Sequence, residues 1–107
     1  MTLSLGTVLL HGDSGSINFE EYKKRITPQR ASVGGIQQLR WLVQHQKECP
    51  ALMALLGKIY IDFPAIVVAS RGMCYSPYCN QGGLLWVDRW FWLGYGFNSL
   101  GRIAFGR

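Results

Sequence analysis

The chain has 107 residues, which is enough for a single domain with one hydrophobic core. Apolar residues make up 49% of it and charged residues only 16%, against about 25% in ordinary globular proteins. This composition excludes a disordered chain and predicts that some apolar surface is left for a partner. The net charge of +5 favours an anionic partner, although a basic face that only solubilises the protein explains it equally well.

The first half of the chain is predicted to be mainly helical. The expected elements are a short strand, a turn, a helix, a connector and two more helices, over residues 3–10, 11–16, 19–26, 27–35, 36–48 and 50–61. Asn18 is a typical N-cap for the first helix, and Pro28 ends that helix. Apolar residues recur at helical spacing in the second helix. Pro50 favours the first turn of the third helix, and Pro64 ends it.

The second half is predicted to consist of strands and loops. Residues 65–69 form a short, largely β-branched run between chain breakers, which predicts a buried strand. Residues 72–83 are rich in Gly and Pro and are interpreted as a loop. The aromatic content of residues 84–93 favours a strand, although a helix stays open as the alternative. Residues 102–105 are expected to pair back on it through a turn at 94–101.

Together these elements predict an α+β fold, a small single domain over residues 1–107 in which a helical pair packs on a short antiparallel sheet. The segment Leu84–Phe97 holds three of the four tryptophans. As a strand, its first part would be apolar on both faces, with Trp86, Trp90 and Trp92 on the same face. A domain of this size has little material to cover both faces, so we expect the segment to be half core and half contact surface.

The sequence contains no motif specific enough to indicate an enzyme, so no catalytic residue and no small-molecule substrate are predicted. We expect an accessory or regulatory protein that docks on a macromolecular partner through an aromatic and basic surface. The candidate partner-binding residues are Lys23, Lys24, Arg25, Arg30, Arg40, Trp41, Arg89 and Trp90. A protein partner or a homo-oligomer is favoured. The alternatives are a nucleic-acid-binding module and a peripheral subunit of a membrane-associated assembly.

The odd number of cysteines, three, fits a reduced cytoplasmic setting better than a disulfide framework. His45 and Cys49 lie four residues apart on a predicted helix, and Cys74 and Cys79 flank a Pro-containing loop. Three thiolates and one imidazole form a legitimate set of ligands for a structural zinc ion. The alternatives are a surface histidine with three buried thiols, or a disulfide between Cys74 and Cys79. No other cofactor, no signal peptide and no transmembrane helix are predicted.

Overall fold

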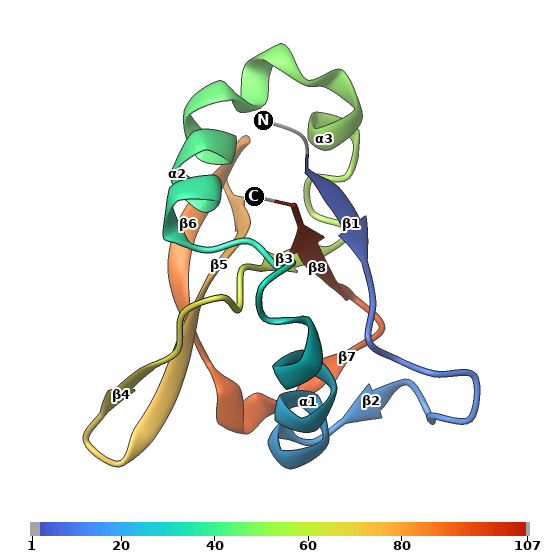
Figure 1. The fold of residues 1–107 in the computed structure, drawn as a ribbon. Helices are drawn as coiled ribbons and strands as arrows, with labels where there is room; N and C mark the ends of the chain where they lie inside the picture. Colours follow the sequence, from blue (N-terminus) through green and yellow to red (C-terminus); the bar gives the residue numbers. More distant parts are fainter. Residues whose placement is uncertain (1–2, 107) are drawn as a thin grey trace.

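The centre of the fold is a mixed, largely antiparallel sheet of six strands, seen in the computed structural model, which describes residues 3–106 (Figure 1). Its strands are β1 (Ser4–Gly6), β3 (Tyr60–Asp62), β4 (Val68–Ser70), β5 (Met73–Gly82), β6 (Leu85–Trp92) and β8 (Gly101–Phe105). β6 pairs with one edge of β5 along the strand, and β3 and β4 share the other edge. Two short strands, β2 (Ser16–Ile17) and β7 (Phe97–Asn98), form a separate pair.

Helices cover both faces of this sheet, so the expected α+β domain is confirmed in its general form. The helices are α1 (Phe19–Ile26), α2 (Ile36–His45) and α3 (Pro50–Ala54), with 3-10 turns η1 (Thr27–Gln29), η2 (Gln46–Glu48) and η3 (Leu93–Tyr95). The expected short antiparallel sheet is confirmed in part: the sheet is largely antiparallel, but β8 runs parallel to β3 while it pairs antiparallel with β1. The predicted pairing of residues 102–105 with residues 84–93 is therefore wrong, because β8 does not pair with β6. β6 pairs instead with its neighbour in sequence, β5.

Residues 72–83, predicted to be a loop, form the longest strand, β5. Pro77 has no N–H to donate, and it is tolerated in β5 because no neighbouring strand needs a hydrogen bond from that position. The Phe63 N–H donates to the Pro77 carbonyl at 2.8 Å, so the backbone polar groups of Pro77 face the side of β3 and β4. Pro77 lies in β5 between the residues that pair with β3 and those that pair with β4. The absent N–H therefore costs no hydrogen bond to β6.

The predicted helices 19–26 and 36–48 are confirmed as α1 and as α2 followed by η2. Asn18 caps α1 by accepting the Glu21 N–H at 2.9 Å. The helix predicted over 50–61 is wrong beyond Ala54, because the chain turns through Gly57, whose φ of +81° favours glycine, and enters β3. The buried strand predicted over 65–69 is wrong too, since β4 begins at Val68 and is exposed.

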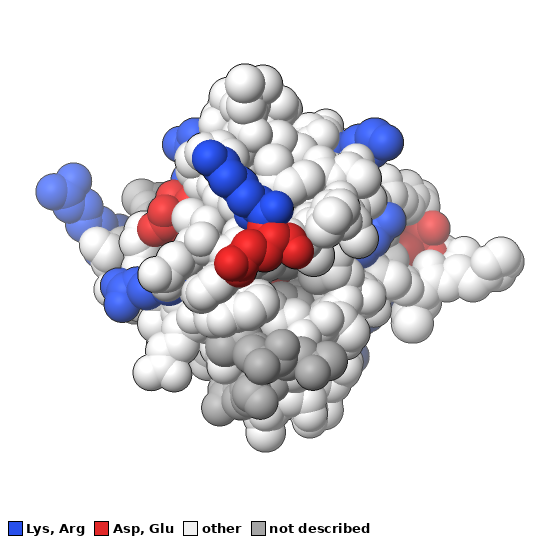
Figure 2. Space-filling model, turned by 90° about the horizontal axis from the view of Figure 1, so that it is seen from above, with Lys and Arg blue, Asp and Glu red and all other residues white. Residues whose placement is uncertain are grey.

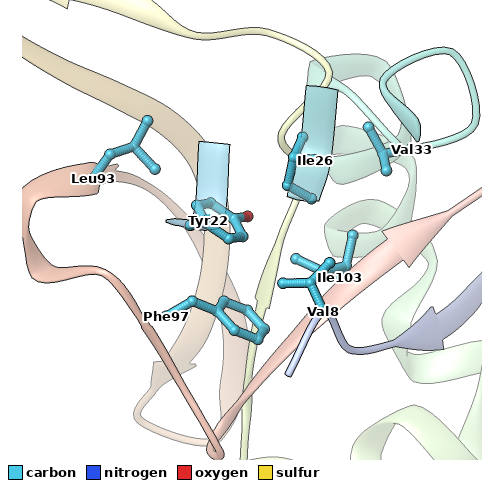
Figure 3. Close-up of a cluster of buried hydrophobic side chains, with 7 residues drawn as sticks. All are labelled: Val8, Tyr22, Ile26, Val33, Leu93, Phe97 and Ile103. Carbon is cyan, nitrogen blue, oxygen red and sulfur yellow. The ribbon is translucent and has the colours of Figure 1, made fainter. Parts of the chain in front are cut away.

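The two faces of the sheet have separate cores. On the α1 face, the ring of Tyr22 stacks on Phe97 with centroids 5.2 Å apart (Figure 3). This cluster consists of Val8, Tyr22, Ile26, Val33, Leu93, Phe97 and Ile103. The cluster on the α2 face consists of Leu39, Leu42, Ile61, Phe63, Cys79, Trp86 and Ala104. Neighbouring strand residues, such as Ile103 and Ala104, therefore point to opposite faces.

One carboxyl group is buried on the α1 face of the sheet. Asp62, which is 0% exposed, accepts hydrogen bonds from the Tyr22 hydroxyl and, at 2.7 Å, from the Ser76 hydroxyl. Burial raises the pKa of Asp62 to about 6, although both hydrogen bonds act to lower it. The network joins α1, β3 and β5 and gives no solvent access to the carboxylate, so we assign it a structural role.

Candidate docking surface

The α2 face of the sheet extends beyond the part that α2 covers. Trp86 lies under α2 and α3 and is 1% exposed, whereas Trp90 and Trp92, on the same face of β6, are 53% and 38% exposed. Tyr75 of β5 lies opposite Trp92, and Val68 of β4 lies opposite Tyr75. With Met73, whose sulfur accepts a bond from the Tyr75 hydroxyl, these residues form what we call the aromatic surface: Val68, Met73, Tyr75, Trp90 and Trp92.

A shallow hollow of about 430 Å³ lies in this surface, lined by Val68, Ser70, Arg71, Tyr75 and Trp90. Arg71 places a guanidinium beside the exposed rings. A second arginine, Arg89, lies on the other face of β6, where its Nε donates to the Asn80 side chain at 2.8 Å. In residues 63–106 the only carboxylate is Asp88. The aromatic face thus carries one guanidinium, of Arg71, and one carboxylate, of Asp88, and the charge of Arg89 lies on the opposite face of β6.

The outer edge of β6 is closed at one end and open at the other. At Trp86, the side chain of Gln46 takes the place of a neighbouring strand: it accepts the backbone N–H at 2.7 Å and donates to the backbone carbonyl at 3.0 Å. Because backbone groups alternate along a strand, the N–H and C=O of Asp88 and Trp90 also point outward. Within residues 3–106, no strand pairs with them.

The predicted basic residues do not converge on the aromatic surface. Lys23 and Lys24 are exposed on α1, on the opposite face of the sheet. Arg25 pairs with Asp13 at 2.7 Å and with Glu21 at 3.0 Å, and its hydrogen bond lowers the pKa of Asp13 below the ordinary value. Arg30 is half-buried and donates to the Pro64 carbonyl.

The remaining predicted contacts, Arg40 and Trp41, are exposed on α2. Trp41 stacks on His45 and borders a second apolar hollow, between β1, α2 and α3, of about 420 Å³. Seen over the end of the molecule that carries α2 and α3, Lys and Arg side chains stand apart, with acidic groups among them (Figure 2). Of the predicted partner-binding residues, only Arg89 and Trp90 belong to β6.

Sequence reasoning missed four residues of the surface: Val68, Met73, Tyr75 and Trp92. The period of two already places Trp92 on the face of Trp90, but it does not tell which part of that face stays exposed, so Trp92 is absent from the predicted contact residues. Tyr75 and Met73 escape prediction because the Gly and Pro content of residues 72–83 favours a loop.

The four predicted zinc ligands are spread over two regions. His45 and Cys49 both line the hollow beside Trp41. Cys74 packs against the α1-face cluster, whereas Cys79 is buried in the α2-face cluster, so the two lie on opposite faces of β5. Burial raises the pKa of the Cys79 thiol, which disfavours the thiolate that zinc requires. Within residues 3–106, no three metal-ligating side chains gather, and the zinc site stays a prediction for metal analysis.

The part of the chain that the structure describes contains no helix long and apolar enough to cross a membrane. No family model, no curated protein and no solved structure matches this chain. Its function has to be inferred from its own side chains and backbone.

Proposed function

We propose that this protein is a non-enzymatic accessory or regulatory protein that docks on a protein partner through its aromatic surface. The observation that carries the proposal is the exposure of Trp90 and Trp92 beside a shallow hollow and an open strand edge. Tryptophan, tyrosine and arginine are the residue types that dominate binding energy at protein interfaces. The hollow lined by Trp90, Tyr75 and Arg71 brings all three together.

The magnitude of the effect supports a docking role. Covering the exposed half of one tryptophan, roughly 120 Å² of apolar area, contributes about 3 kcal/mol to association. Within the described residues, Trp90 lies outside the buried cluster that includes Trp86 and is left half exposed. A partner that covers Trp90 and Trp92 gains this energy without a large change in the fold.

Nucleic acid is the second candidate, because exposed rings stack on bases and arginines bind phosphates. Two observations favour protein. The lysines of α1 lie on the opposite face of the sheet from Trp90, and Arg25 is neutralised by Asp13 and Glu21. A strand edge, in turn, offers hydrogen-bond groups that match a polypeptide backbone.

The test is co-purification from the native source after nuclease treatment, with wild-type protein, Trp90→Ala and Trp41→Ala as baits. The two variants remove one exposed tryptophan each, from different surfaces, so Trp41→Ala is the matched control. We expect a protein that is retained by wild type and Trp41→Ala and lost with Trp90→Ala, with little dependence on salt. Partners retained equally by all three baits, or nucleic acid whose binding falls steeply with salt, would refute the proposal.

A further inference from the structure

We infer that the outer edge of β6 binds an extended segment of the protein partner as an added antiparallel strand, and that this segment alternates apolar with acidic side chains. The inference rests on the proposed function and specifies the partner's chemistry and its mode of binding.

The edge available for such a strand is short and well bounded. Gln46 closes it at Trp86, and the chain turns away at η3, so the open stretch is residues 88–92. Asp88 and Trp90 offer an outward N–H and C=O each. An added strand of about five residues, roughly 17 Å long, covers this stretch. Antiparallel addition continues the pattern by which β4, β5 and β6 already pair.

The side chains on the two faces of β6 define what the segment carries. In an antiparallel pair, directly opposite residues share a face of the sheet. Partner residues opposite Asp88 and Trp90 therefore lie on the α2 face, beside the exposed ring of Trp90, where apolar side chains fit. The residues between them lie on the α1 face, beside Arg89, whose side chain is exposed apart from its bond to Asn80. An acidic side chain fits there.

Charge separates this occupant from a second copy of the chain. Each copy carries a net charge of +5, so two copies repel each other, whereas an acidic segment is attracted. Pairing Asp88 with Trp90 of a second copy would also set the two Arg89 side chains directly opposite each other, and like charges in that position are destabilising.

The probe is a short fluorescent peptide that alternates valine with glutamate, titrated against the intact protein. Two further peptides of the same sequence carry N-methyl groups, one on the valine amides and one on the glutamate amides. Valines opposite Asp88 and Trp90 turn their N–H groups toward β6, and the glutamate N–H groups turn away. We expect methylated valines to weaken binding at least about tenfold, and methylated glutamates to leave it within about twofold.

A variant of the protein tests the same bonds from the other side. Asp88→Pro removes an N–H that points outward and none that faces β5. We therefore expect the fold to be retained, as checked by thermal unfolding, and peptide binding to fall at least about tenfold. Asp88→Ala keeps the N–H and removes a negative charge, so it binds the acidic peptide at least as well as wild type.

Four results would overturn the inference: equal effects of the two methylated peptides, loss only with methylated glutamates, equal binding of a peptide that alternates valine with lysine, or binding of oligouridine alone. Concentration-dependent self-association that Asp88→Pro abolishes would assign the edge to a second copy.

Capture of the co-purified partner by the variants distinguishes strand addition from docking through the aromatic surface. If its capture needs Trp90 but tolerates Asp88→Pro, strand addition fails and the docking proposal stands; if Trp90→Ala has no effect, the docking proposal fails.

Discussion

The buried carboxyl of Asp62 makes the stability of this protein depend on pH in an unusual direction. Its pKa is about 6 in the folded protein, against an ordinary value of 3.8, because burial disfavours the charged form. A raised folded pKa contributes stability that is fully present below about pH 3.8 and is lost as the pH rises through about 6. The full contribution is about 3 kcal/mol, of which about 2 kcal/mol develops between pH 7.5 and pH 4.5.

The substitution that isolates this effect is Asp62→Asn, which removes the charge and keeps the shape. The new amide oxygen accepts from one of the two hydroxyls, of Tyr22 or Ser76, and the other hydroxyl rotates to accept from the amide N–H. Urea unfolding of both proteins between about pH 4.5 and pH 7.5 gives a difference profile that cancels every other titrating group. We expect wild type to gain about 2 kcal/mol relative to Asp62→Asn on acidification. A flat difference profile, or a relative loss, would refute a raised pKa for the buried Asp62.

Three further predictions concern the core, the closed edge and one tight turn. Trp86→Ala should destabilise the protein by about 3–5 kcal/mol and Trp90→Ala by less than about 0.5 kcal/mol; similar values in urea unfolding would contradict the division into core and contact tryptophans. Gln46→Ala should cost about 2–4 kcal/mol, because it strands the buried N–H and C=O of Trp86; a loss below about 1 kcal/mol would show that the edge is not closed there. Gly96→Ala should lower the melting temperature more than Gly12→Ala. Gly96 has a φ of +73°, and a Cβ added there would collide with the Ile17 carbonyl, whereas a Cβ added at Gly12 would meet open space. Equal shifts of the melting temperature would contradict this prediction.

Sequence reasoning succeeded where the signals are local. The Asn18 cap, the acidic first turn and the basic last turn of α1 are all within a few residues, and the apolar spacing of α2 lies within one helix. Aromatic content and flanking glycines favour a strand over residues 84–93, and β6 occupies nearly the same range.

The errors arose where distant parts of the chain decide the outcome. Pro77 reads as a loop residue until β3 and β4 are seen to leave a gap opposite it. The parallel pairing of β3 with β8 joins segments about forty residues apart, which no local pattern predicts. Trp86 and Trp90 share a face, and the positions of α2 and α3 bury the first and leave the second exposed. The bonds of Gln46 to β6 span 40 residues in the same way.

Residue-resolved amide hydrogen exchange in the free protein shows whether the edge of β6 beside Trp90 is open. The Trp86 N–H is held by Gln46, and the alternation of the ladder turns the Arg89 and Phe91 N–H groups toward β5. We predict slow exchange at these three amides and fast exchange at Asp88 and Trp90, which become protected when the valine–glutamate peptide binds. Protection of Asp88 and Trp90 equal to that of Arg89 in the free monomer would show that this edge is not open.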